Sequence, residues 1–339
     1  MTRKSWTPGR VNLIGEWIDF NGGHVLPAAL PLGVTVVLSA RDDGVDHVCS
    51  VQFSGYQSAL LDAPKSGGWA DYVFGALQAA RQEGWIEGGW SARLSSDIPP
   101  GAGVSSSAAV TVGVLRAAAG EAVDATRIAV LARKVENDFI GMPCGIMDQM
   151  AVAHAGPGEA LGLNTRNLEF ERLALPGRWQ FIIIHSGVER QLAEGRYKQR
   201  RDSCLLAANK LGVEYLCDAR AIDGLPDDIL PLVRHVVSEE CRTVSSMSAL
   251  RKQDIETFGS LMSASHASLR DDFGVSTLEV DTLVADALRL GAKGARMTGA
   301  GFGGCIVALL EQDASPDWWP QLSKRHPRAR FVARIAASP

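Results

Sequence analysis

The chain has 339 residues, of which 46% are hydrophobic and 21% charged, and its formal net charge is −4. This composition is ordinary for a folded globular protein and excludes a disordered chain. The slightly negative charge argues against nucleic acid as the main partner, because nucleic-acid binding needs a basic surface. The longest apolar stretch, residues 25–40, is broken by two prolines and is shorter than the roughly 20 residues that span a bilayer. We therefore expect no membrane association.

The cysteines and the N-terminus point to a cytoplasmic protein. The six cysteines are scattered and none forms a CxxC pair, so we expect reduced thiols. Residues 5–9 do not form the apolar segment of a signal peptide.

Strands and helices alternate along the chain without a repeat or a low-complexity linker. In chain order we expect strands at 35–39, 47–53 and 91–95, helices at 106–119 and 126–139, a strand at 181–185, helices at 193–211, 238–269 and 281–290, and a strand at 305–310. At roughly 150 residues per domain the length suggests two domains. Glycine and proline interrupt the pattern over residues 156–178, and we place the domains at 1–166 and 167–339.

Three glycine-bearing segments stand out, and the first is residues 8–23. It places one arginine, two acids and two asparagines between glycines, and it is too broken to be a helix or a strand alone. Loops of this composition often carry function, but a polar turn after a strand has the same appearance. Both interpretations stay open at this point.

The second segment, residues 99–109, predicts a phosphate-binding loop. Gly101 and Gly103 allow the backbone to approach a ligand, and three serines, Ser105 to Ser107, then open a helix. The free N–H groups and positive dipole end of such a helix hold phosphate oxygens, and a serine hydroxyl can ligate Mg²⁺. The alternative is an ordinary serine N-cap after a glycine turn. The segment is not a Walker A loop, because GxxxxGK(S/T) occurs nowhere in the sequence, and it is not GxGxxG, because Ser106 takes the third glycine position.

The third segment, residues 295–305, has four glycines in six residues and leads into a predicted strand. Such a run indicates a tight loop that approaches a ligand or another backbone closely. Together with the second segment it suggests a nucleotide held between two domains.

Asp148 follows Pro143 and Gly145 in an apolar stretch. A carboxylate buried there must be paired or have a raised pKa, and Arg10 is the candidate partner. An Asp–Arg pair that faces a substrate hydroxyl supplies a base and a charge stabiliser for phosphoryl transfer. A purely structural ion pair is the alternative.

Taken together, these segments resemble the GHMP kinase superfamily and, within it, the galactokinase family. The resemblance is carried in the family's order by residues 8–16, 101–108, 141–149 and 295–305, with further likeness at 234–239 and 265–272. It implies an α+β fold of two domains with the active site in the cleft between them. It also implies ATP-dependent phosphorylation of the anomeric hydroxyl of D-galactose.

The resemblance assigns a role to each motif residue. Asp148 matches the catalytic base, Arg10 the residue that orients it, and Ser107 and Glu136 the Mg²⁺ ligands. The positions that bind ATP match Trp69 and Tyr72 at the adenine and Gly101, Gly103, Ser105, Ser106 and Ser107 at the phosphates. The sugar-contacting positions match Glu16, Trp17, Asp19, Gly145 and Tyr197.

The chain departs from the family in its sugar motif. Galactokinases usually have Gly-Glu-His-x-Asp-Tyr, whereas residues 15–20 are Gly-Glu-Trp-Ile-Asp-Phe. Indole is larger than imidazole and has one donor and no acceptor. Trp17 therefore fills the space left by a sugar that lacks the exocyclic CH₂OH group, such as L-arabinose, or stacks on a modified sugar, or turns away from the pocket and leaves galactose to bind.

The implied partners are a small-molecule sugar and ATP, with Mg²⁺. We expect a monomer, with a weak homodimer as the alternative. The chain begins almost at the first motif, so residues 5–7 are expected to find strand pairing without the family's helical N-terminal extension. A non-catalytic sugar and ATP sensor is the alternative of another class, and the four matched residues Asp148, Arg10, Ser107 and Glu136 favour an active kinase.

Overall fold

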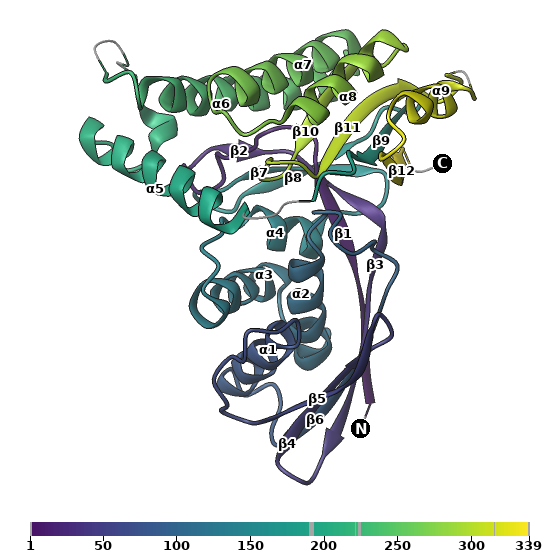
Figure 1. Cartoon of the computed structure of the whole chain (residues 1–339). Coiled ribbons are helices and arrows are strands. Elements are labelled where there is room, and N and C mark those ends of the chain that lie inside the picture. Colours follow the sequence, from purple (N-terminus) through teal and green to yellow (C-terminus); the bar gives the residue numbers. More distant parts are fainter. Residues whose placement is uncertain (1, 190–192, 221, 223–224, 315, 338–339) are drawn as a thin grey trace. The chain divides into compact units, whose positions relative to one another are not determined.

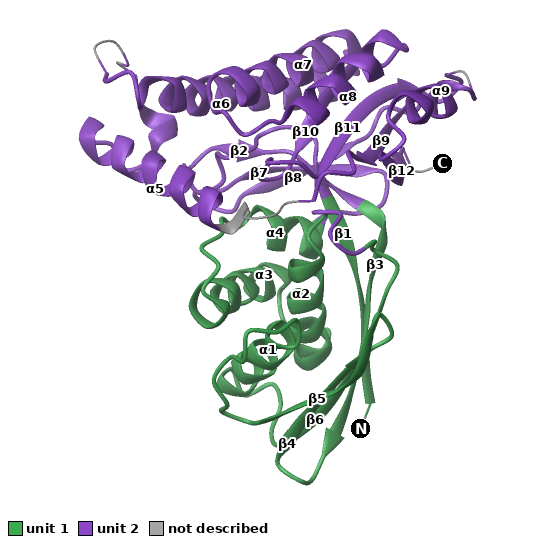
Figure 2. Cartoon of the chain, viewed as in Figure 1, with its two compact units in different colours: residues 1–10, 30–99, 104–154 green, residues 11–29, 100–103, 155–339 purple. Residues whose placement is uncertain are grey.

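The computed structural model describes residues 2–189, 193–220, 222, 225–314 and 316–337 (Figure 1). They form two compact units, coloured separately in Figure 2. The first unit comprises residues 1–10, 30–99 and 104–154, and the second comprises 11–29, 100–103 and 155–339. Each unit draws on several stretches of chain, and the expected limit at residue 166 stays a prediction.

The first unit is a sheet covered by helices. Its strands lie in the order β1, β3, β6, β4, β5, with β4 parallel to β6 and β5 antiparallel to β4. The strands are β1 (Thr2–Asn12) and β3 (Pro27–Arg41), which both continue into the second unit, and β4 (Val45–Ser50), β5 (Phe53–Leu60) and β6 (Gly89–Ser96). The helices are α1 (Asp71–Gln82), α2 (Ser106–Ala119), α3 (Ala125–Lys134), the π-helix η1 (Val135–Ile140) and α4 (Met147–His154).

Helix α2 is the centre of the first unit, because it packs against α1, α3 and α4. Its other side lies on β1 at Gly113, where a Cβ atom would come within 2.9 Å of Thr7 Oγ1. Thr7 Oγ1 also donates to the Ala109 carbonyl at 2.7 Å, and Ser5 Oγ donates to the Gly113 carbonyl at 2.7 Å. The small residues of α2 therefore allow close packing of helix on strand.

The second unit contains an antiparallel sheet of order β10, β11, β9, β12, with Val307 opposite Ile183 at its buried centre. The strands of this sheet are β9 (Trp179–His185), β10 (Gly294–Thr298), β11 (Cys305–Glu311) and β12 (Arg330–Ala336). The second unit also holds β2 (His24–Val25), β7 (Glu159–Asn164) and β8 (Phe170–Ala174), and β7 pairs with both β2 and β8. Its helices are α5 (Ala193–Leu211), the 3₁₀-helix η2 (Leu216–Asp218), α6 (Leu230–Arg251), α7 (Ile255–Asp271), α8 (Leu278–Arg289) and α9 (Trp318–Arg325). Helices α7 and α8 both pack on β10 (Figure 1).

Most of the predicted elements are confirmed. Helices α2 and α5 have the predicted bounds, and the helix predicted over 126–139 is α3 continued by the π-turn of η1. The strands predicted at 35–39, 91–95, 181–185 and 305–310 lie within β3, β6, β9 and β11. The part of the chain that the structure describes holds no helix with the length and apolarity needed to cross a bilayer.

Two predicted elements are wrong in extent. The helix predicted over 238–269 is two helices, because Gln253 adopts a left-handed backbone with φ of 56° and Asp254 caps α7 by accepting from Thr257 N at 3.1 Å. The strand predicted over 47–53 ends at Ser50, and Phe53 already begins the next strand after a turn.

Candidate active site

Arg10 and Asp148 form the predicted ion pair in the first unit. Arg10 Nε donates to Asp148 Oδ1 at 2.7 Å and Arg10 Nη2 donates to Oδ2 at 2.9 Å. The Arg10 side chain is 7% exposed and that of Asp148 is 29% exposed. The pair is bidentate, which fixes the plane of the carboxylate, and the carboxylate still reaches solvent.

Ser105 completes the hydrogen bonding of Asp148. Its hydroxyl donates to Asp148 Oδ2 and makes no cap to the backbone of α2. Ser105 also has φ of 60°, in the left-handed region that costs a non-glycine residue on the order of 1 kcal/mol. Ser105 is therefore no ordinary N-cap, and the sequence carried no signal for its contact with Asp148.

Glu136 lies beside this pair in the π-helix η1. Its side chain is 5% exposed, its Oε1 accepts from Gln149 Nε2 at 2.8 Å, and it accepts a hydrogen bond from Ser107. Burial raises the pKa of Glu136 to about 7, and the negative charge of Asp148 adds to the rise. Hydrogen bonds from Gln149 and Ser107 and the charge of Arg10 counter it only partly.

The side-chain oxygens of Glu136 and Ser107 are suited to bind a magnesium ion. A carboxylate and a serine hydroxyl are hard oxygen ligands, and a buried carboxylate whose partners are neutral groups is compensated by a bound cation. Among the described residues, no three His, Cys, Asp or Glu side chains gather to hold a metal. Mg²⁺ usually takes one or two carboxylates and fills its other positions with phosphate and water.

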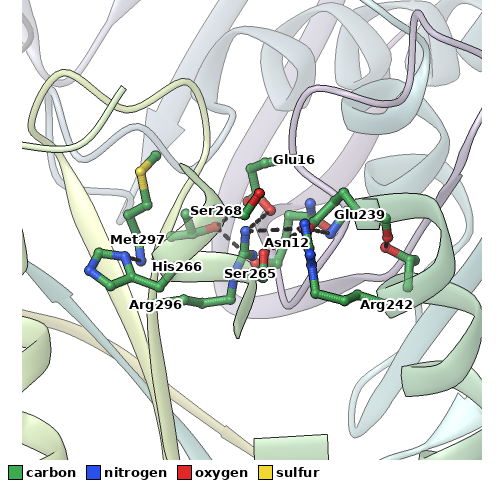
Figure 3. A network of polar contacts seen from close by, with 12 residues as sticks. Asn12, Glu16, Glu239, Arg242, Ser265, His266, Ser268, Arg296 and Met297 are labelled. Atoms are coloured by element: carbon green, nitrogen blue, oxygen red, sulfur yellow. Dashed lines mark hydrogen bonds and ion pairs between the residues drawn. The ribbon is translucent and has the colours of Figure 1, made fainter. Parts of the chain in front are cut away.

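A buried charge network lies in the second unit (Figure 3). Arg296 is fully buried, and its Nη2 lies 2.5 Å from Glu16 Oε2 and 3.7 Å from Glu239 Oε1. Glu16 Oε1 also accepts from the backbone N of Gly299, the first glycine of the third glycine-bearing segment, at 2.9 Å. Glu239 accepts from Gly15 N at 3.1 Å and from Ser265 Oγ at 2.6 Å. The network thus ties the first motif to α6, α7 and β10.

The surroundings of Glu16 and Glu239 stabilise the ionised carboxylate to different degrees. Burial raises the pKa of Glu16, and Arg296 counters that rise only in part. For Glu239, burial is outweighed by attraction to His235, Arg296 and Arg242 and by the bond from Ser265, which hold the pKa at about 2. Neither Arg296 nor Glu239 was predicted to take part in the site.

Trp17 belongs to a cluster of aromatic rings in the second unit. It is 5% exposed and has φ of 69°, and its ring centroid lies 4.8 Å from Tyr197 and 5.0 Å from Phe273. Phe20 contacts Trp17 edge-on at 6.2 Å. The Trp17 indole N–H is buried, and no described residue accepts a hydrogen bond from it.

The other predicted site residues are placed as follows. Asp19 is half-buried in the second unit, and Gly145 is buried in the first, three residues before Asp148. Gly101 and Gly103 have φ of 71° and 69° and belong to the second unit, whereas Ser106 is exposed at the start of α2.

Trp69 and Tyr72 stand at the beginning of α1 and are both half-buried. Trp69 stacks on Phe53, with the ring centroids 4.9 Å apart and the planes at 16°. Phe53 was not predicted to take part in the site.

Three family models match the chain. They are the galactokinase galactose-binding signature at residues 5–40, the GHMP kinases N terminal domain at 71–156, and GHMP kinases C terminal at 246–321. The galactokinase of Levilactobacillus brevis is 36% identical over 99% of this chain and 94% of its own. That of Pyrococcus furiosus is 37% identical over 91% of this chain and 88% of its own.

Solved structures give the same result. The galactokinase of Lactococcus lactis, complexed with galactose, superposes with a TM-score of 0.93 at 31% identity, covering 99% of this chain and 94% of its own. The mevalonate kinase of Methanococcus jannaschii shares the fold, with a TM-score of 0.75 at 19% identity over 100% and 99% of the two chains. The expected two-domain α+β fold of the GHMP kinases is confirmed.

The raised pKa of Glu136 predicts a pH-dependent stability. Between its usual 4.5 and about 7, the folded protein keeps a proton that the unfolded chain has lost. Wild-type stability therefore falls as the pH rises through this window, by up to roughly 3 kcal/mol. In Glu136→Gln this loss is absent, so the variant gains stability over wild type from pH 5 to pH 8. Urea unfolding without divalent metal measures the gain, and a difference independent of pH would contradict it.

Removing Arg296 is expected to destabilise the second unit. Arg296→Met leaves Glu16 buried without its cation, and such a loss costs about 3–5 kcal/mol. Adding Glu16→Gln removes the uncompensated charge, so the double variant should regain part of the loss. A double-mutant cycle by urea unfolding measures the coupling, and simply additive losses would show that the two side chains do not stabilise each other.

Proposed function

Because the chain belongs to the galactokinase family of GHMP kinases, we propose that it transfers the γ-phosphoryl group of ATP to the anomeric hydroxyl of D-galactose. Membership of this family makes the chain a phosphotransferase that uses ATP. The observation that carries the proposal is the bidentate pair of Arg10 and Asp148, with Ser105 on the same carboxylate.

Asp148 acts as the general base. It takes the proton of the anomeric hydroxyl, whose oxygen forms a bond to the γ-phosphorus while the bond from that phosphorus to the β–γ bridging oxygen breaks and ADP leaves. Oδ2 accepts hydrogen bonds from Arg10 and Ser105, and Oδ1 accepts one from Arg10. Oδ1 thus has the freer lone pair for the proton. The Arg10 guanidinium holds the carboxylate in one orientation and offsets the negative charge that develops at the reacting oxygens.

The remaining roles follow the family motifs. Ser107 and Glu136 hold Mg²⁺, which when bound offsets the charge of the transferring phosphates. The nucleotide residues are Trp69 and Tyr72 for adenine and Gly101, Gly103, Ser105, Ser106 and Ser107 for the phosphates. The sugar residues are Glu16, Trp17, Asp19, Gly145 and Tyr197. ATP as the phosphoryl donor supports a cytoplasmic location, and a monomer remains the expected state.

A second candidate is a kinase for a galacto-configured sugar altered at C6, such as L-arabinose. The position of Trp17 favours it. Trp17 is buried, and its indole packs on Tyr197, one of the predicted sugar-contacting residues. An indole in this place fills volume that a hydroxymethyl group would need, and its only polar group is the N–H donor.

The proposal predicts that ADP release with Mg²⁺-ATP is fastest on D-galactose within a panel containing L-arabinose, D-fucose, N-acetylgalactosamine and D-glucose. Asp148→Ala should lower turnover at least 10³-fold, because no other group would take the proton at its position. It should leave ATP affinity largely intact. Substantial turnover in Asp148→Ala would show that another group is the base, and silence of wild type on every sugar would support a sensor.

The second candidate predicts a change of preference in Trp17→His. If the indole sets specificity, the ratio of kcat/KM for D-galactose to that for L-arabinose should rise about tenfold or more, equivalent to the 1–3 kcal/mol of one altered pocket contact. The measurement is ADP release on both sugars. Phe20→Tyr, which reverts the other departure from the family motif, is assayed separately so that the two positions can be compared. Unchanged sugar ratios in Trp17→His would exclude the indole as the specificity determinant.

A further inference from the structure

Asp71 is a buried carboxylate whose hydrogen bonds all go to the loop before α1. It is 3% exposed, and its two oxygens accept from the backbone N of Ser66 at 3.0 and 2.9 Å and from Ser66 Oγ at 3.0 Å. Its Oδ2 also accepts from Gly67 N at 2.6 Å and from Gly68 N at 3.2 Å. Burial raises the pKa of Asp71, but the bonds from Ser66, Gly67 and Gly68 outweigh it and lower the pKa.

These hydrogen bonds fix the conformation of residues 66–68, whose two glycines do not favour a single conformation by themselves. Gly67 has φ of 93° and no atom near its missing Cβ, and Gly68 follows it directly. Two adjacent glycines have high conformational entropy, which opposes a single loop geometry. An ionised carboxylate that gathers three successive N–H groups offsets that entropy. The residue that follows this turn is Trp69.

Two further contacts fasten the same loop. Lys65 Nζ donates to the carbonyl of Ile140 at 2.6 Å, and Gln78 Nε2 donates to the carbonyl of Ala63 at 2.8 Å. Ile140 ends the π-helix η1, which also carries Glu136. The loop before Trp69 is therefore held to the element that positions the proposed magnesium ligand.

Phe53, which precedes this loop in the sequence, holds the ring of Trp69 by stacking on it. Phe53 begins β5, and its ring is stacked on the indole at 4.9 Å and 16°. Trp69 is only half-buried, so part of the indole stays open to a ligand. Stacking of a nucleobase on an aromatic side chain favours binding, and more of that free energy is realised when the ring is already held in place.

We propose that Asp71 and Phe53 are positioning residues that hold Trp69 as a preformed platform for the adenine ring of the nucleotide. The proposal rests on the proposed function, because it takes Trp69 to be part of the ATP site. It adds Asp71 and Phe53, which act on the base indirectly, by holding the indole of Trp69 on which the base would stack.

The test compares a nucleotide with a phosphate chain that has no base. In Asp71→Asn one oxygen becomes an NH₂ group, and in either orientation of the amide that group meets a backbone N–H: that of Ser66 at the Oδ1 position, or those of Ser66, Gly67 and Gly68 at the Oδ2 position. Calorimetric titration in the presence of Mg²⁺ measures the dissociation constants of ADP and of tripolyphosphate. We expect the constant for ADP to rise about tenfold and the constant for tripolyphosphate to stay unchanged. Asp124→Asn is the matched control, because Asp124 accepts from Arg127 N at the start of α3. It should leave both constants unchanged.

Phe53→Leu keeps the test independent of folding, because Phe53 is 46% exposed. It should weaken ADP binding three- to tenfold and spare tripolyphosphate. An equal loss for ADP and tripolyphosphate in Asp71→Asn and Phe53→Leu would overturn the proposal. ADP affinity unchanged in both variants would overturn it as well.

Trp69→Leu separates the positioning role of Asp71 and Phe53 from the place of Trp69 in the nucleotide site. If it weakens ADP binding while Asp71→Asn and Phe53→Leu do not, the positioning role alone is refuted. If Trp69→Leu leaves ADP affinity unchanged, Trp69 is not in the nucleotide site, and that part of the proposed function is refuted with it.

Discussion

The two parallel hydrogen bonds from Arg10 to Asp148 are the interaction around which the first unit arranges its reactive groups. They join the end of β1 to the start of α4 across 138 residues of sequence, so they depend on the sheet and the helices being packed correctly. A planar guanidinium holds both carboxylate oxygens in one plane, which an ammonium group cannot do. Ser105 donates a hydrogen bond to that carboxylate. The negative charge of the same carboxylate adds to the rise in the pKa of Glu136.

Three buried carboxylates of this protein are stabilised in three ways. Glu239 lies between Arg296 and Arg242 and stays ionised well below neutral pH. Asp71 stays ionised through backbone N–H groups. Glu136 has neutral hydrogen-bond donors, Gln149 and Ser107, and its pKa rises to about 7. Of the three, Glu136 is the one that a bound cation would stabilise most, which supports its proposed role with Mg²⁺.

A structural feature could be predicted from the sequence where its cause lies in neighbouring residues, and could not where it depends on residues far away in the chain. Helix α2 was predicted to the residue because its small apolar run without proline is a local signal. The break before α7 depends on the backbone of Gln253, and only Asp254, as a capping residue, signals it. The Arg10–Asp148 pair was predictable from an acid in an apolar stretch, whereas Arg296 was not. A fully buried arginine depends on carboxylates far away in the sequence, such as Glu16.

The left-handed backbone of Ser105 has a consequence for how this protein can be improved or can evolve. Glycine adopts that backbone without the cost that serine bears, so relief of backbone strain alone would favour glycine at this position. The same change would remove the hydroxyl that holds Asp148 Oδ2, and a hydrogen bond to a charged group is worth more than this strain. The advantage of serine at 105 therefore depends on the carboxylate at 148, and a chain that lost that carboxylate would be more stable with glycine at 105.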